Sequence, residues 1–191
     1  HPSVPVKSVG ELIAYSRANP KKLNIASAGI GGLDHLAGEL FKQQTGATYT
    51  VIPYKGSGPA MTALLSGEVG GSLTTLVTSI PLVRTDRLRA IGVTTPKRSR
   101  ALPDVPTIGE TVPGFAVPDT WLGVLGPANL PAPQIGKLNE EIRKAINATD
   151  VKARLEGLGL VVTGNTPAQF DAQLRADTEV FRKIVTNAGI R

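Results

Sequence analysis

The chain has one concentrated set of groups that could bind a ligand, and these groups belong to the backbone. Residues 23–27 are a short apolar run, a turn with Gly29, Gly31 and Gly32 follows, and an amphipathic segment starts at Leu33. Such a junction directs several N–H groups and the positive end of a helix dipole at one point. The sequence predicts that the N–H groups of residues 31–34 bind a carboxylate or phosphate. A tight turn without a ligand would show the same pattern.

Two titratable side chains follow the glycines. Asp34 stands in the expected first turn of the helix, where a carboxylate favours the dipole, and we interpret it as a cap; turned inward it would repel an anion. His35 is the only histidine beyond position 1 and the chain has no cysteine, so neither a catalytic triad nor a conventional zinc site is indicated. We interpret His35 as a packed or surface residue and predict no metal and no cofactor.

The glycine turn departs from the known nucleotide-binding motifs. Asp34 stands where a dinucleotide fingerprint needs its last glycine, and no acidic residue follows the next strand at Tyr54 to hold a ribose. The Gly-Lys-Ser/Thr of a P-loop is absent, and Ser57 lacks the spacing of a hydrolase nucleophile elbow. An enzyme that holds a phosphate-bearing substrate at residues 29–32 stays as an alternative, with its general base on the same helix.

Other side chains could line the same site. A second strand–loop–helix junction contains Tyr54, Lys55 and Ser57, and Ser57 or Gly58 is a candidate helix cap. Thr74 and Thr75 place hydroxyls near a strand end, where α/β sheets bind ligands. The full predicted ligand-binding set is Ser27, Ala28, Gly29, Ile30, Gly31, Gly32, Leu33, Asp34, Thr74 and Thr75, and the further cleft candidates are Tyr54, Lys55, Ser57 and Trp121. Trp121, the only tryptophan, is interpreted as a core or cleft-wall residue.

The elements that must hold these residues alternate between strand and helix. Strands are expected at residues 23–27, 49–53, 71–76 and 88–93, and helices at residues 8–19, 33–44, 57–67 and 79–85. This alternation with short links predicts an α/β fold with a mostly parallel sheet flanked by helices. After a Pro- and Gly-rich stretch, residues 120–125 are expected to be extended, and the last third shows helical spacing.

Composition bounds the class of protein. The 191 residues suit one large domain or two small lobes, and 41% hydrophobic residues are enough for a packed core. The net charge of +6 is scattered, its densest cluster around Arg98 is interpreted as a solvated loop, and the 4% of aromatics argue against nucleic-acid binding. Neither a membrane span nor a signal peptide is visible, so the chain is expected to be cytosolic or a mature or trimmed form of an exported protein.

Several stretches together resemble one known family, the Bug receptors of tripartite tricarboxylate transporters. The matching stretches are His-Leu-Ala-Gly-Glu-Leu-Phe at 35–41, residues 51–60, 64–69, 88–94 and 98–106, and Trp121, Gly123, Pro127, Pro131 and Leu138-Asn139 in the tail. The resemblance implies a type II periplasmic-binding-protein fold that closes on a small carboxylate and delivers it to a membrane permease. It also implies a periplasmic location and no enzymatic activity.

The resemblance implies that backbone N–H groups of two facing loops bind the carboxylate, one of them at residues 27–34. This chain departs from the family at two places. Gly32, Leu33 and Asp34 stand where members usually carry hydroxyl residues, and Gly70 and Gly71 occupy a region that usually has an acidic residue. Thr74 and Thr75 follow in that same region.

The resemblance also implies how the chain is divided. Residues 1–120 would be the complete second lobe, and residues 121–191 would be the crossover and the C-terminal helices of the first lobe. The N-terminal part of that first lobe is expected to be missing, so the apolar tail is expected to pair with another copy of the chain. A truncated form that binds nothing stays as a further alternative, because half of the clamp would be absent.

Overall fold

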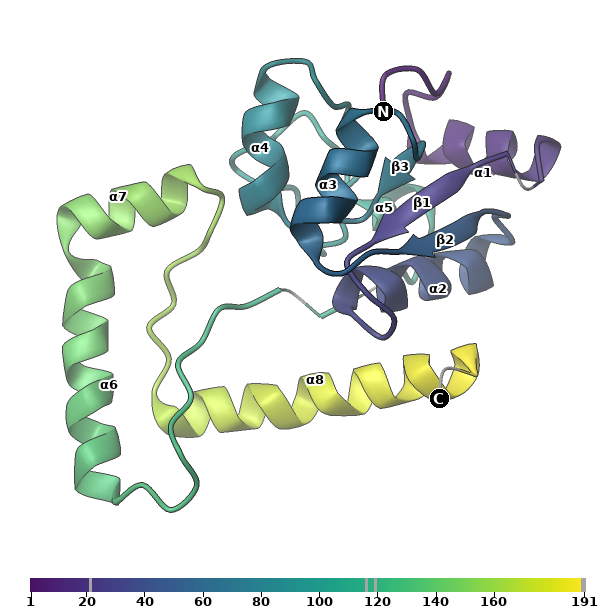
Figure 1. Ribbon diagram of the computed structural model, residues 1–191. Coiled ribbons are helices and arrows are strands. Elements are labelled where there is room, and N and C mark those ends of the chain that lie inside the picture. Colours follow the sequence, from purple (N-terminus) through teal and green to yellow (C-terminus); the bar gives the residue numbers. More distant parts are fainter. Residues whose placement is uncertain (21, 116, 119, 190–191) are drawn as a thin grey trace.

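The computed structural model describes residues 1–20, 22–115, 117–118 and 120–189. Strands and helices alternate over the first half, and helices alone follow (Figure 1). In chain order they are α1 (Val9–Ala18), β1 (Asn24–Ser27), α2 (Leu33–Thr45), β2 (Thr50–Pro53), α3 (Ser57–Leu65), β3 (Gly71–Ser72), α4 (Leu76–Arg84), α5 (Ile108–Thr111), α6 (Ala132–Asn147), α7 (Thr149–Gly157) and α8 (Pro167–Ala188).

The described strands form a parallel sheet in the order β2-β1-β3. In its register, Ile25 of β1 lies opposite Val51 on one side and Gly71 on the other. Parallel strands end at the same edge of a sheet, and here a helix follows each strand directly. The N-termini of α2, α3 and α4 therefore lie along one edge of the sheet, as the predicted α/β alternation requires.

Two predicted strands are wrong, one in its extent and one in its presence. The predicted strand 71–76 is only β3, because Thr75 becomes the N-cap of α4, which also begins earlier than expected. The predicted strand 88–93 is absent from the described sheet. Its start turns back on α4, where the Leu88 N–H donates to the Leu82 carbonyl at 3.2 Å. At its end Val93 makes only an isolated parallel bridge to Thr107.

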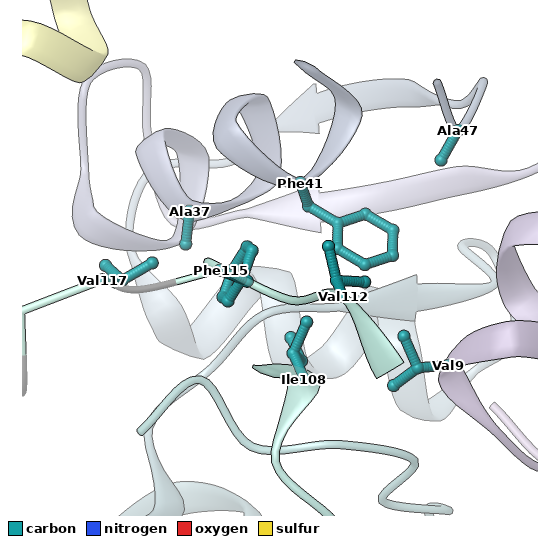
Figure 2. Close-up of a cluster of buried hydrophobic side chains, with 8 residues drawn as sticks. All are labelled: Val9, Ala37, Phe41, Ala47, Ile108, Val112, Phe115 and Val117. Atoms are coloured by element: carbon teal, nitrogen blue, oxygen red, sulfur yellow. The ribbon is translucent and has the colours of Figure 1, made fainter. Parts of the chain in front are cut away.

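One hydrophobic cluster packs α2 against α1, α5 and the chain that follows α5 (Figure 2). Ala37 and Phe41 face it because they are four residues apart on one side of the helix. The Phe41 ring meets the edge of Phe115 with the ring centroids 6.2 Å apart. The helix ends at Gly46, which adopts a left-handed φ of 63°. This packing fixes the direction in which the start of α2 points.

A second cluster packs α3 against the sheet. Ala60, Ala63 and Leu64 of α3 are buried with Ala26 of β1 and with Leu88. Three alanines on the contact allow the helix and the strand to approach closely. Because α2 and α3 each have a separate buried cluster, the two helices that begin beside the glycine turn are both anchored in the core.

The C-terminal part is arranged differently. No residue of α6 or α7 is buried, and Figure 1 shows both helices standing apart from the sheet. Helix α8 runs back beneath α2, with Phe181 packed against the first cluster and Ile184 buried. Its start is capped, since Thr166 and Gln169 form a capping box around Pro167. The division at residue 120 into two lobes stays a prediction.

Candidate functional site

The two strand–loop–helix junctions that the sequence singled out are joined by backbone hydrogen bonds. The Tyr54 N–H donates to the Ser27 carbonyl and the Gly56 N–H donates to the Ala28 carbonyl, each at 2.8 Å. These bonds extend the β1–β2 pairing beyond the strand ends. The glycine turn and the start of α3 are therefore neighbours at one edge of the sheet.

Side chains of α2 reach back to two of the turn's amides. The Ala28 N–H donates to Oδ2 of Asp34 at 2.5 Å, and the Gly31 N–H donates to Nδ1 of His35 at 2.9 Å. Asp34 was interpreted as a helix cap; instead it bonds an amide six residues earlier, and the N-cap residue Gly32 has no side-chain cap. The Asp34 carboxylate thus accepts a hydrogen bond from a backbone N–H of the turn, the kind of donor that the sequence predicted would bind a ligand.

Two more amides of the turn bond within it. The Gly29 N–H donates to Oγ of Ser27 at 3.2 Å, and the Ser27 hydroxyl in turn donates to the Gly29 carbonyl at 2.9 Å. The Gly32 N–H donates to the same Gly29 carbonyl at 3.3 Å. The amides of Gly31 and Gly32, which the sequence predicted as ligand donors, are therefore already engaged and would have to exchange partners to bind an anion.

The first turn of α2 carries the available donors. Leu33, Asp34 and His35 precede the first helical hydrogen bond, which runs from Leu36 N–H to the Gly32 carbonyl at 2.9 Å. Within the parts of the chain that the structure describes, no acceptor is found for these three N–H groups or for that of Ile30. Because they lie at the positive end of a 13-residue helix, they form a favourable position for a carboxylate.

His35 is held by its neighbours rather than poised for catalysis. Since Nδ1 accepts from Gly31, the ring proton is on Nε2, which lies 3.6 Å from Oε1 of Glu39. The side chain is 13% exposed. Glu39 is also paired with Lys42. These contacts agree with the interpretation of His35 as a packed or surface residue, and they show in addition that its ring orders the turn.

The second junction contributes less than expected. The Tyr54 hydroxyl donates to Oε1 of Glu68 at 2.7 Å, and this hydrogen bond is the main reason that the pKa of Tyr54 is raised. Ser57 was a candidate cap, but the N-cap of α3 is Gly56, with φ of 108°, and Ser57 is the first helical residue. Lys55 and Ser57 are exposed. Their assignment to the cleft stays a prediction.

Thr74 and Thr75 lie at the start of α4 instead of at the end of a longer strand. Their hydroxyls are 3.0 and 3.2 Å from the hydroxyl of Thr78, which also donates to the Thr75 carbonyl at 2.9 Å. The three hydroxyls therefore form a small exposed network at the start of α4. Contact with a ligand stays a prediction for both predicted residues.

Trp121 lines a hollow of about 300 Å³ between the start of α2 and helix α8. Its indole N–H donates to Oδ2 of Asp177 at 3.0 Å, and its ring meets Phe170 edge-on at 4.9 Å. The hollow is lined by Leu33, Trp121, Leu174, Asp177, Thr178 and Phe181. Sequence reasoning missed the four α8 residues of this set. Their helical spacing marks a common face but does not say what that face meets.

Among residues 1–20, 22–115, 117–118 and 120–189, no three or more His, Cys, Asp or Glu side chains are placed together to hold a metal ion. In the same part of the chain, no helix has the length and apolar character that crossing a membrane requires.

The model of the tripartite tricarboxylate transporter family receptor matches residues 1–189. The chain belongs to this family. Its α/β fold is also that of solved relatives. The Rpa4515 protein of R. palustris, solved with adipate, is 33% identical with a TM-score of 0.90 over 98% of this chain. The periplasmic binding protein BugD is 30% identical with a TM-score of 0.88 over 98% of this chain.

These relatives are longer than the chain described here. A UPF0065 protein from the tcbD-tcbE intergenic region of Pseudomonas sp. (strain P51) is 36% identical over 94% of this chain, which spans 54% of that relative. The chain spans 62% of Rpa4515 and 63% of BugD. This receptor-family chain therefore aligns with somewhat more than half of each relative. Trp121 and the glycine turn lie within residues 1–189, which the family model matches.

Proposed function

We propose that this protein is a solute-binding receptor for a small organic carboxylate, bound at the sheet edge where α2 begins. Membership of the receptor family carries the proposal. The N–H groups of Leu33, Asp34 and His35, for which the described part of the chain supplies no acceptor, give a physical reason, because they are fixed donors at the positive end of a helix. The relative solved with adipate supports a carboxylate as the ligand class.

The proposal extends to partners, location and organisation. The receptor works in the periplasm and hands its ligand to the permease subunits of a tripartite transporter. Residues 1–120 form the second lobe and residues 121–191 belong to the first lobe, where the exposed apolar side chains Leu122, Val124 and Leu125 pack against further chain or against a second copy. A ligand held between two lobes meets donors from both, so the described donors account for one side of the site.

A thermal-shift titration with a panel of carboxylates tests the proposal. It is run on this chain and on a fusion that adds the remaining segment of Rpa4515. A bound ligand stabilises the folded state in proportion to the logarithm of its concentration, so a carboxylate at one hundred times its Kd adds about 2.7 kcal/mol. Adipamide is the matched control for adipate, because it has the same body without a charge. If no carboxylate stabilises either protein, the receptor proposal is wrong.

Substitutions at position 33 test the backbone donors directly. Leu33 is the first residue of α2, where proline is tolerated, and Gly32 already has the extended conformation that precedes proline, with φ of −67° and ψ of 163°. Leu33→Pro removes one N–H, whereas Leu33→Ala shortens the side chain and keeps the N–H. We expect Leu33→Pro to weaken carboxylate binding at least tenfold more than Leu33→Ala does.

A further inference from the structure

The side chains that the glycine turn presents to solvent are apolar. Ile30 is 73% exposed and Leu33 is 43% exposed. Neither position carries a hydroxyl or an amide that could bond an oxygen-rich ligand. A ligand carboxylate on the amides of Ile30 and Leu33 would therefore have hydrocarbon beside it.

Leu33 connects these amides to the hollow of about 300 Å³ in front of α8. Its N–H belongs to the available donors, and its side chain forms part of the lining. The opposite wall is apolar as well, with Trp121, Leu174 and Phe181. A ligand anchored by a carboxylate at the start of α2 can thus extend its body into this hollow.

The side-chain donors of the lining already have hydrogen-bond acceptors. The Trp121 indole N–H donates to Asp177 at 3.0 Å, and the Thr178 hydroxyl donates to the Leu174 carbonyl at 2.6 Å. Both side-chain donors of the lining are therefore used. Asp177 adds a carboxylate, which accepts hydrogen bonds and donates none when ionised. The described lining thus has no side-chain donor left to compensate a second ligand carboxylate for lost water, and the charge of Asp177 repels one.

We infer that the receptor selects monocarboxylates with an apolar body over hydroxylated or polyvalent carboxylates, an inference that rests on the proposed function. Ile30, Leu33 and Trp121 contact the hydrocarbon body and set this preference. Asp177 is the residue that disfavours a second carboxylate. The ligand class is thus a short aliphatic or aromatic monocarboxylate, with its charged end at α2 and its body facing α8.

Isothermal titration calorimetry tests the preference with butanoate, hexanoate, adipate, ε-aminocaproate and citrate, on this chain and on the fusion with Rpa4515. Burial of the two extra methylenes predicts that hexanoate binds about tenfold more tightly than butanoate. Adipate is expected to bind more weakly than hexanoate, and citrate more weakly still. ε-Aminocaproate tests the alternative hypothesis that Asp177 binds an ammonium group of the ligand. If ε-aminocaproate binds more tightly than hexanoate, the inference is wrong.

Three variants separate the contributions. Leu33→Ser keeps the backbone donor and is expected to reduce the difference in affinity between hexanoate and butanoate. Val161→Ser, at a residue 82% exposed between α7 and α8, is the matched control and is expected to leave that difference unchanged. Asp177→Asn keeps an acceptor for Trp121 and removes the charge. The affinity for adipate is therefore expected to rise at least fivefold relative to that for hexanoate.

The outcomes distinguish the inference from the function on which it rests. If none of the carboxylates binds either protein, both are wrong. If carboxylates bind but citrate binds as tightly as hexanoate, the receptor function stands and the apolar preference is wrong. If Leu33→Ser and Val161→Ser affect chain-length dependence equally, Leu33 does not contact the ligand body.

Discussion

Oδ2 of Asp34 accepts a hydrogen bond from the backbone N–H of Ala28 at 2.5 Å, so a side chain of helix α2 closes the turn that leads into it. The contact places a negative charge at the end of the helix where a ligand carboxylate is proposed to bind. It stabilises the turn, because a carboxylate is favoured at a helix N-terminus and makes a strong hydrogen bond there. It also competes with an anionic ligand for the same donors.

Substitution of Asp34 tests this competition. On the proposed function, Asp34→Ala frees the Ala28 amide and removes the like charge, so we expect carboxylates to bind several-fold more tightly and with a stronger dependence on salt. Asp34→Asn keeps an acceptor for Ala28 but lacks the charge, so it is expected to give an intermediate affinity. Calorimetry at two salt concentrations measures both. Weaker binding in both variants would show that Asp34 only organises the turn.

A second prediction concerns the pH dependence of stability through Glu110. Its carboxylate pairs with Arg98 at 2.6 Å and accepts from the Thr107 N–H at 2.9 Å, and these contacts, the Arg98 hydrogen bonds first, lower the pKa of Glu110 to about 2. A lowered folded-state pKa gives stability that is fully present above the unfolded pKa and is lost as the pH falls through the folded pKa. Glu110→Gln is therefore expected to cost stability at neutral pH, and that cost is expected to disappear between about pH 5 and pH 2.

Chemical denaturation of both proteins across this pH range measures the effect. The exposed Glu156 of α7 supplies the control, since Glu156→Gln is expected to change stability little at any of these pH values. A constant difference between the native protein and Glu110→Gln down to pH 2 would contradict the prediction.

The sequence predicted the fold best where local signals and tertiary packing agree. The helix at Leu33 was correctly placed because an apolar face, a glycine start and Gly46 at its end all indicate the same element. Residues 88–93 are a short, mostly apolar run of the length of a strand, yet Leu88 is buried by a turn against α4. An apolar run indicates burial, but it does not show whether a neighbouring strand is present to complete the hydrogen bonds.

The candidate site shows the same limit at the level of atoms. The glycine turn was recognisable because few other patterns gather so many backbone donors. Which donors are available depends on the conformations of Asp34 and His35, which reach back to Ala28 and Gly31. The α8 wall depends on how a helix more than 130 residues later in the chain packs beside Leu33. Neither relation leaves a signal in the order of residues alone.

A third prediction concerns Tyr49, whose hydroxyl donates to the Gly38 carbonyl of α2 at 2.6 Å. Burial is the main cause that raises its pKa, and the nearby charge of Glu39 adds to it. Tyr49→Phe is expected to lower stability by about 1 kcal/mol through the lost hydrogen bond. Tyr15→Phe, the same change in α1, is the control.

The pH dependence of the Tyr49 contribution has the opposite sign to that of Glu110. A tyrosine with a raised folded-state pKa prefers the neutral form, so its contribution is present below the unfolded pKa of about 10 and falls as the pH rises above it. An ultraviolet pH titration is expected to show Tyr49 ionising last, after Tyr54, whose pKa is also raised, and Tyr49→Phe should remove that late step. If the late step persists in Tyr49→Phe, its assignment to this residue is wrong.

A last prediction concerns the close approach of β1 and β3. A Cβ at Gly71 would lie 2.8 Å from Cδ1 of Ile25, its partner in the sheet register. Gly71→Ala is therefore expected to destabilise the protein by about 1–3 kcal/mol. Ile25→Val removes the clashing methyl and on its own costs about 0.5–1.5 kcal/mol. Because the smaller side chain makes room for the new Cβ, we expect the double variant to lose less stability than the sum of the two single changes.

A double-mutant cycle by urea denaturation measures this coupling, with an interaction of at least about 0.5 kcal/mol as the expected result. Gly136→Ala is the matched control, because a Cβ at that position of α6 meets no atom within 4 Å. In a helix interior that change is expected to be neutral or to stabilise by up to about 1 kcal/mol. If the losses of unfolding free energy in Gly71→Ala and Ile25→Val are strictly additive, β3 moves away from β1 as a unit. The sheet edge beside the glycine turn would then deform more easily than its packing indicates.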